Sequence, residues 1–142
     1  MRTAAVVYRS RTGRTRRYAE EIGAHLRTRG LQVVVASVGD ADPMALAAAD
    51  IVLLGCWTNG LLVVMQHPDQ PWIDFVREIP SLDGPRVGLF ATYRYLTGSM
   101  FAKMREALAG KAGEISLELK SRNGALSAAN RAALDRFVDG SR

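Results

Sequence analysis

Cysteine and histidine are scarce in this 142-residue sequence, which has one cysteine and two histidines. Cys56 cannot form a disulfide within the chain, and a lone thiol is typical of a reducing compartment, so we expect the protein to be cytoplasmic. The sequence contains no cysteine–histidine cluster with metal-ligand spacing, no Ser–His–Asp set and no pair of carboxylates spaced for acid–base catalysis. It therefore predicts neither a metal site nor a catalytic site of those types.

Long apolar runs are also missing. No run reaches the ~18–20 residues that a membrane-spanning helix needs. The first residues lead directly into a short β-rich segment, without the apolar stretch and cleavage site of a signal peptide. Hydrophobic residues make up 48% of the sequence and charged residues 23%, as in ordinary globular proteins. We therefore expect one domain over residues 1–142, with no membrane span.

Acidic residues are few at the start of the chain. Residues 1–30 contain eight arginines and two glutamates, a local charge of +6, whereas the net charge of the whole chain is +5. We therefore expect the positive excess to lie around the first loop and helix. Such a cluster fits an anion site, an acidic docking partner or a nucleic acid. No nucleic-acid recognition motif accompanies it, so we expect no nucleic-acid partner.

Short β-rich segments alternate with helical segments along the chain. We expect strands at 3–8, 31–36, 51–54, 87–91 and 114–119, and helices at 15–29, 42–49, 71–79, 99–108 and 127–138. This alternation predicts a parallel sheet with helices on both faces. Ligands bind such sheets at the carboxyl ends of the strands, which indicates the loops at 9–15, 56–70 and 92–98.

The first of these loops contains the sequence Ser-Arg-Thr-Gly-Arg-Thr at residues 10–15. The hydroxyls of Ser10, Thr12 and Thr15 can each donate a hydrogen bond to a phosphate oxygen. Gly13 allows backbone N–H groups to turn inward, and the following helix adds the positive end of its dipole. The loop lacks the glycine and lysine spacing of triphosphate and dinucleotide sites. It predicts a site for one terminal phosphate, and the alternative is an ordinary strand–helix turn with a hydroxyl N-cap.

Residues 6–19, Val-Val-Tyr-Arg-Ser-Arg-Thr-Gly-Arg-Thr-Arg-Arg-Tyr-Ala, resemble the flavodoxin signature over its whole length. The apolar pair, the aromatic residue, the serine, the threonine and the final alanine fall at matching positions. The resemblance implies a flavodoxin-like three-layer α/β/α sandwich of the short-chain form, with a five-stranded parallel sheet in the order 2-1-3-4-5. It also implies FMN as the cofactor, with its phosphate bound by Ser10, Thr12 and Thr15 and by the N–H groups of residues 11–15.

The arginines of this region depart from the family pattern. Flavodoxins more often carry asparagine where this sequence has Arg14, and they hold the phosphate without arginine. Arg11, Arg16 and Arg17 add further positive charge. A cation in the first turn of a helix is unfavourable by about 0.3–1 kcal/mol unless an anion opposes it. We interpret the cluster as a complement to an anion or an acidic partner, and the alternative is that each arginine is solvated and points away from the helix end.

Two later loops resemble the segments that enclose the flavin ring in this family. Trp57 is the expected stacking residue of the first loop, with a core tryptophan as the alternative. The pair Asn59-Gly60 is a turn signal, and the resemblance implies a peptide flip there when the flavin is reduced. With the other loops, the expected cofactor-binding residues are Ser10, Arg11, Thr12, Gly13, Arg14, Thr15, Trp57, Thr58, Asn59, Gly60, Thr92, Tyr93, Tyr95 and Gly98.

In the second flavin loop, Tyr93 or Tyr95 is expected to stack on the opposite face of the ring. Arg94 stands where family members often carry acidic residues. A positive charge there would favour the anionic, fully reduced flavin, and a surface arginine without such a role is the alternative.

The resemblance implies an FMN-binding electron-transfer protein that shuttles electrons to or from a redox partner, such as a flavodoxin reductase or a terminal acceptor enzyme. Given the charge of residues 1–30, we expect that partner to have an acidic docking face. Two alternatives stay open. One is a small FMN-dependent reductase whose long loop at 61–70, with its apolar run at 61–65, forms a substrate pocket, although this run could also be a dimer or partner contact. The other is a flavodoxin-like binding module without flavin. Cys56 is expected to be buried, His25 to lie at the surface or its boundary, and His67 could reach the flavin edge.

Overall fold

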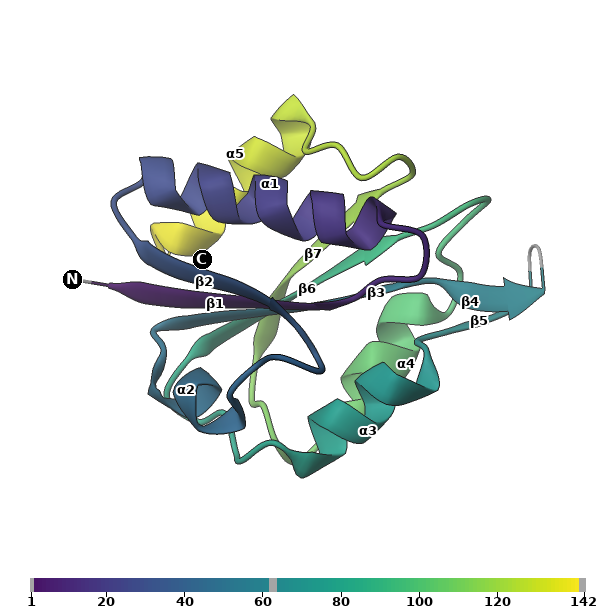
Figure 1. Cartoon of the computed structure of the whole chain (residues 1–142), viewed down its shortest axis with the longest axis horizontal. Coiled ribbons are helices and arrows are strands. Elements are labelled where there is room, and N and C mark those ends of the chain that lie inside the picture. Colours follow the sequence, from purple (N-terminus) through teal and green to yellow (C-terminus); the bar gives the residue numbers. More distant parts are fainter. Residues whose placement is uncertain (1, 62–63, 141–142) are drawn as a thin grey trace.

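The computed structural model describes residues 2–61 and 64–140 and is organised around a five-stranded parallel sheet (Figure 1). The strands of this sheet are β1 (Thr3–Arg9), β2 (Gln32–Ser37), β3 (Ile51–Trp57), β6 (Arg86–Thr92) and β7 (Ile115–Ser121). They lie side by side in the order β2-β1-β3-β6-β7. Because β6 and β7 are the fourth and fifth strands of this sheet along the chain, the predicted order 2-1-3-4-5 is confirmed.

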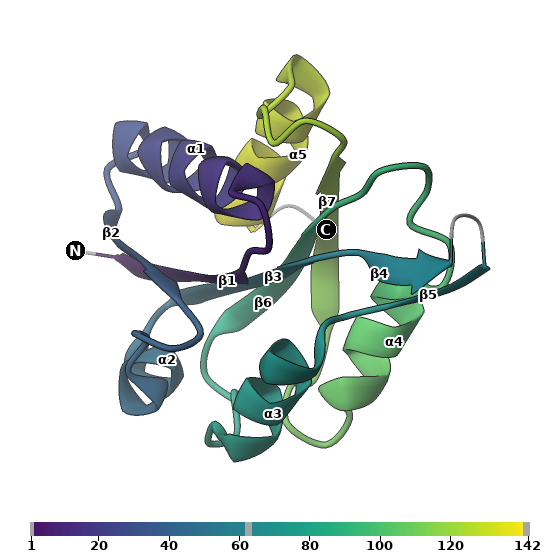
Figure 2. The ribbon, with the colours of Figure 1, turned by 45° about the vertical axis from the view of Figure 1, so that its right-hand side comes forward.

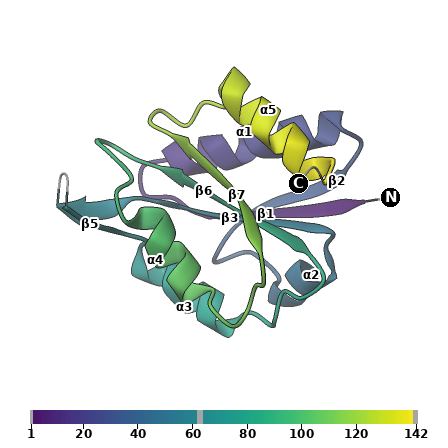
Figure 3. The same cartoon turned by 180° about the vertical axis from the view of Figure 1, so that it is seen from behind.

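Helices cover both faces of the sheet (Figures 1 and 3). α1 (Arg14–Thr28) and α5 (Ala128–Val138) pack on one face, and α2 (Pro43–Ala48), α3 (Gln70–Glu78) and α4 (Met100–Ala107) pack on the other. Each face therefore has its own hydrophobic core, which confirms the expected three-layer α/β/α arrangement. Within the described part of the chain, no helix combines the length and apolar character that crossing a membrane requires.

The central strands are buried on both sides because their side chains alternate between the two cores. Val6 of β1 and Leu53 of β3 face the core beneath α1 and α5, whereas Val7 and Leu54 face the opposite core. This explains why the sequence of these strands is a nearly continuous apolar run. β7 lies at the edge of the sheet and alternates buried with exposed residues, as its sequence predicts.

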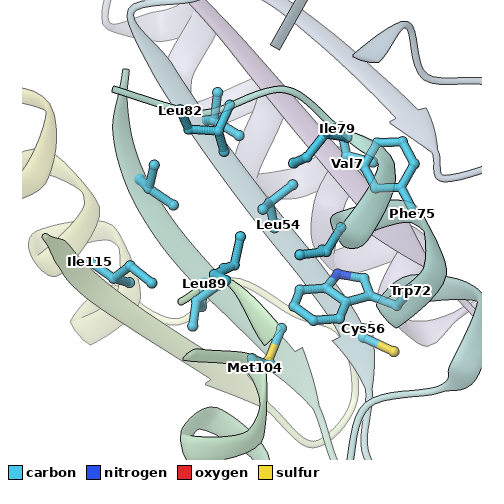
Figure 4. Close-up of a cluster of buried hydrophobic side chains, with 14 of the residues drawn as sticks. Val7, Leu54, Cys56, Trp72, Phe75, Ile79, Leu82, Leu89, Met104 and Ile115 are labelled. Atoms are coloured by element: carbon cyan, nitrogen blue, oxygen red, sulfur yellow. The ribbon is translucent and has the colours of Figure 1, made fainter. Parts of the chain in front are cut away.

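Cys56 lies in the core formed with α2, α3 and α4 (Figure 4). Its side chain is completely buried and belongs to the same cluster as Trp72 and Met104. Burial away from water raises the pKa of the Cys56 thiol to about 12. The expectation that Cys56 is buried is confirmed, and its thiol stays protonated at neutral pH.

The prediction of an irregular loop over residues 56–70 is wrong. β3 continues to Trp57, and β4 (Asn59–Leu61) and β5 (Val64–His67) form an antiparallel pair beside α4 (Figure 2). The pairing is short and its register shifts between Asn59 and Leu61, so the sequence lacks the regular alternation that indicates a strand. Asn59 and Gly60 accordingly lie in β4 and not in a separate turn.

Candidate functional site

A cavity of about 270 Å³ lies at the carboxyl edge of the sheet. The cavity lies at the point where the strand order reverses, because β2 is on one side of β1 and β3 is on the other. The walls come from the segments that follow β1, β3 and β6. The residues that line the cavity are Arg11, Thr12, Arg14, Thr15, Trp57, Thr58, Asn59, Gly60, Gln66, Thr92, Tyr93, Arg94, Tyr95 and Leu96.

The lining includes all of the expected cofactor-binding residues except Ser10, Gly13 and Gly98. It also includes Gln66, Arg94 and Leu96. Gln66 belongs to β5 and lies within the segment 56–70 that is expected at the site, but nothing in the sequence singles it out. The three predicted loops are therefore brought together in space.

The loop after β1 is shaped by the Ser10 hydroxyl. Ser10 Oγ accepts hydrogen bonds from the N–H of Gly13 at 3.0 Å and from the N–H of Arg16 at 3.3 Å. Gly13 precedes α1 with φ 99°, a left-handed conformation that glycine adopts at little cost. The loop thus curls over the N-terminus of α1, where the helix dipole favours an anion. Thr12 stands exposed in this curl and lines the cavity.

Two buried hydroxyls connect α1 with the end of β6. Thr15 Oγ1 and Thr92 Oγ1 share a hydrogen bond of 2.7 Å, and the two residues are only 1% and 3% exposed. One of the two protons is used within the pair, so the other hydroxyl proton can be donated into the cavity that both residues line.

Trp57 is oriented by Asp69, the residue before α3. Trp57 Nε1 donates a hydrogen bond to Asp69 Oδ2 at 3.2 Å, and Arg9 Nε donates to the same oxygen at 2.8 Å. Asp69 Oδ1 also accepts from the N–H of Gln70 at 3.1 Å, which caps α3. The indole edge is thereby fixed while the ring lines the cavity.

Asp69 was not among the predicted site residues. An acidic residue shortly before a proline is a helix-start signal, and Asp69 with Pro71 has that form. The signal indicates the cap on α3, but the link to Trp57 depends on tertiary packing that the local sequence does not contain.

Thr58 lies at the wall of the cavity, between β3 and β4. The N–H of Thr58 donates to the carbonyl oxygen of Thr92 at 2.8 Å, and this hydrogen bond joins the segment after β3 to β6. Its Oγ1 is buried, lines the cavity wall and has no hydrogen-bond partner in the described part of the chain. A buried polar atom of this kind is normally satisfied, so a polar ligand edge in the cavity would complete it.

The loop after β6, residues 92–98, places Tyr93 and Tyr95 at the cavity, and the ring of each tyrosine has at least one cation beside it. The guanidinium carbon of Arg94 lies 5.6 Å from the ring centroid of Tyr95, which is 49% exposed. Lys120 Nζ and the guanidinium carbon of Arg122 lie 5.9 and 5.8 Å from the ring centroid of Tyr93. Distances of this size are typical of cation–π contacts.

The arginines of the first loop and turn separate into two groups. Arg11 and Arg14 line the cavity, and the guanidinium carbon of Arg11 lies 5.1 Å from the ring centroid of Trp57. Arg16 and Arg17 instead form ion pairs with Glu20 and Glu21, at 3.4 and 3.0 Å. Only the first two therefore add positive charge to the site itself.

The arginines expected around the first loop and helix do not all lie at the cavity. Arg2 donates to the carbonyl oxygen of Val138, and Arg27 and Arg29 lie at the far end of α1, where Arg29 pairs with Asp135 and Asp139. None of these three arginines lines the cavity. Cations from elsewhere in the chain, Arg94, Lys120 and Arg122, take their place beside the cavity.

The two histidines do not line the cavity. His67 Nδ1 lies 2.9 Å from the carbonyl oxygen of Pro68, and His25 Nε2 lies 2.7 Å from Asp135 Oδ1. His25 is half-buried between α1 and α5, so its expected boundary position is confirmed. Of the apolar residues 61–65 considered as a substrate pocket, 62 and 63 lie outside the described residues, and Met65 is 71% exposed.

The donors and rings of this cavity fit FMN in their chemistry. Hydroxyls and a helix N-terminus lie at one end, and they suit a phosphate monoester. Aromatic rings and the unpaired Thr58 hydroxyl suit a flat heterocycle with polar edges. Fold and site together define a nucleotide-binding α/β protein with its site at the switch point of the sheet.

Comparison with known proteins agrees with this class. A family model described as flavodoxin matches residues 6–135. Flavodoxins of Megasphaera elsdenii and Clostridium beijerinckii are 33% and 31% identical over 93 and 106 residues, which are 66% and 74% of this chain and 66% and 75% of theirs. The solution structure of two-electron reduced M. elsdenii flavodoxin has a TM-score of 0.77 at 22% identity, covering 97% of this chain and 99% of that one.

The chain therefore belongs to the flavodoxin family. Its class of function is that of the family, FMN-binding electron transfer.

Proposed function

We propose that this chain, acting as a single domain over residues 1–142, carries electrons on an FMN held in the cavity and exchanges them with an acidic protein partner. The observation that supports this most strongly is the convergence of three loops. A hydroxyl-rich loop at a helix N-terminus and two loops with aromatic rings line one cavity at the switch point of the sheet.

In this proposal, the phosphate lies at the N-terminus of α1. Thr12 and one hydroxyl of the Thr15–Thr92 pair donate to phosphate oxygens. Backbone N–H groups of residues 11–15 assist, except that of Gly13, which already donates to Ser10 Oγ. Ser10 acts mainly by holding the loop, because its Oγ already accepts two backbone N–H groups; its own proton is still available for the phosphate. Arg14 adds charge at this end of the cavity.

The flavin ring lies against the aromatic residues of the other two loops. Trp57, fixed by Asp69, and Tyr95 or Tyr93 provide the stacking surfaces, and the Thr58 hydroxyl reaches a polar edge of the ring. FMN supplies the redox chemistry when it is bound, and the protein provides orientation and access. The exposure of Tyr95 indicates that one ring edge stays close to solvent, where a partner can approach.

The charges around the cavity favour a partner with an acidic docking face. Arg11, Arg14, Arg94, Lys120 and Arg122 are all exposed and lie at or next to the cavity. A patch of one sign steers an oppositely charged partner toward the edge where electrons would leave. A flavodoxin reductase or a terminal acceptor enzyme with such a face fits this role.

A cytoplasmic location belongs to the same proposal. The one cysteine of the chain is buried and protonated, so the fold uses no disulfide and does not depend on an oxidising compartment.

Titration with FMN and riboflavin tests the phosphate end directly. The wild type should bind FMN far more tightly than riboflavin, and Thr12→Ala should weaken FMN by about 5- to 150-fold, the loss of a hydrogen bond to a charged group. Thr28→Ala changes another exposed threonine, at the far end of α1. It is the matched control and should leave FMN affinity unchanged.

Equal affinity for the two flavins, or equal effects of the two substitutions, would contradict the phosphate site. Turnover of NAD(P)H without a partner protein would instead support an FMN-dependent reductase.

A further inference from the structure

The described charged side chains that line the cavity are all positive. Among the described residues that line it, the charged side chains are Arg11, Arg14 and Arg94, and none of them is acidic. Lys120 and Arg122 extend the same sign to the ring of Tyr93. A ligand in this cavity is therefore surrounded by cations whatever its own charge.

These arginines occupy two different ends of the cavity. Arg14 is the first residue of α1, so it belongs to the phosphate end, and its Nη1 donates to the carbonyl oxygen of Arg122 at 3.5 Å. The guanidinium groups of Arg11 and Arg94 instead lie on the rings of Trp57 and Tyr95. The aromatic contacts hold these two cations next to the surfaces on which the flavin ring stacks in the proposed function.

The charge of FMN changes at only one of these ends during electron transfer. Uptake of two electrons from a donor and one proton from water converts the neutral ring of oxidised flavin into a monoanion. The phosphate keeps its charge throughout. A cation near the ring therefore interacts more favourably with the reduced form, whereas a cation near the phosphate stabilises both forms alike.

We propose that Arg11 and Arg94 make the cavity selective for the anionic, two-electron-reduced form of FMN, while Arg14 strengthens binding of both forms equally. This inference rests on the proposed function, because it requires FMN in the cavity. By thermodynamic linkage, tighter binding of the reduced form raises the two-electron reduction potential of the bound flavin by the equivalent amount.

The test measures dissociation constants of the wild type and its variants for oxidised FMN and for dithionite-reduced FMN under anaerobic conditions. Arg11→Gln and Arg94→Gln should each lower the ratio of the oxidised to the reduced dissociation constant by about two- to fivefold, because exposed charges act through solvent. Arg94→Lys keeps the charge and should restore the wild-type ratio, which separates charge from packing. The effect should shrink at high salt.

Two further variants complete the design. Arg14→Gln should raise both dissociation constants by the same factor and leave their ratio unchanged. Arg27→Gln, at the far end of α1, should change neither constant.

An unchanged ratio in Arg11→Gln and Arg94→Gln would overturn this inference while leaving FMN binding intact. A wild type that binds neither form of FMN would instead overturn the proposed function. If Arg14→Gln lowered the ratio of the two dissociation constants as much as Arg11→Gln and Arg94→Gln do, the effect would come from the total positive charge of the cavity. That result would contradict a specific action of Arg11 and Arg94 at the flavin ring.

Discussion

At the scale of single side chains, Asp69 determines how Trp57 is presented to the cavity. One of its carboxylate oxygens receives Trp57 Nε1 and Arg9 Nε, and the other caps α3. Hydrogen bonds to an ionised acceptor are stronger than those between neutral groups. The same side chain therefore stabilises a helix and orients an aromatic ring of the site.

Asp69→Ala should separate these two roles when it is compared with Asp42→Ala. Asp42 caps α2 through the N–H of Met44 and does not line the cavity. Loss of either cap should lower the free energy of unfolding by about 0.5–2 kcal/mol, measured by urea denaturation. Only Asp69→Ala should also release the indole, reduce the quenching of bound FMN fluorescence and weaken FMN binding. Equal quenching in the two variants would show that Asp69 acts only as a cap.

The turn at residues 10–15 could be predicted because its residues are contiguous. Ser10 and Gly13 act through neighbours a few positions away. Two hydrogen bonds could not be predicted in the same way: the one between Thr15 and Thr92, and the one from Trp57 to Asp69. Those contacts join segments that only the folded sheet brings together.

At the scale of elements, the β4–β5 pair is the part that the sequence did not reveal. The central strands of the main sheet are nearly continuous apolar runs, and β7 alternates apolar with polar residues. Several helices have caps and periodic apolar positions, so these elements were predictable. β4 spans only three residues and contains a register shift, so its pattern resembles a loop. Gly60 sits at this irregularity with φ 153°, and an added Cβ would lie 2.9 Å from the carbonyl oxygen of Met65. The glycine therefore permits a close approach within the pair.

Gly60→Val should disturb the β4–β5 pair beside the cavity without unfolding the domain. The new side chain conflicts with the β5 backbone and opposes the positive φ, so the peptide between Asn59 and Gly60 should lose the freedom to flip. We expect a lower maximum of one-electron-reduced flavin during a spectroscopic reductive titration. Gly113→Val is the control, since a Cβ at Gly113 meets no atom within 4 Å. A full yield of the one-electron form in Gly60→Val would mean that no flip occurs at this position.

At the scale of the whole molecule, carboxylates connect α1 with the C-terminal part of the chain. Glu21 accepts the N–H of Leu126 at 2.9 Å, and this hydrogen bond, with the nearby Arg17, lowers the pKa of Glu21 below its ordinary 4.5. The hydrogen bond with His25 and the charge of Arg29 lower the pKa of Asp135 below its ordinary 3.8. Both carboxylates are therefore ionised more readily in the folded state than in the unfolded one.

The pH dependence of stability follows from these two directions. A carboxylate whose pKa is lowered on folding stabilises the fold above its unfolded pKa, and that contribution is lost as the pH falls through the folded value. We expect the free energy of unfolding, measured by urea denaturation, to decline from about pH 4.5 downward. Glu21→Gln should make this decline shallower. An unchanged decline in Glu21→Gln would show that other carboxylates dominate it.

The distribution of charge over the whole molecule carries the central claim, that this flavodoxin transfers electrons through a cationic face to an acidic partner. Five exposed cations lie at or next to the cavity. Arg16 and Arg17 are instead paired with glutamates of α1, and Arg29 is paired with Asp135 and Asp139. Exposed charges are screened beyond about 8–10 Å at physiological ionic strength, so association through this face should depend on salt.

The most direct measurement is the rate of electron transfer, by stopped-flow absorbance, from the reduced FMN-loaded protein to two haem proteins of similar potential, one acidic and one basic. The acidic acceptor should be reduced faster at low salt, with a rate that falls steeply as salt rises, and the basic acceptor should show a slow rate that rises with salt. Rates that are flat in salt, or a preference for the basic acceptor, would contradict the claim.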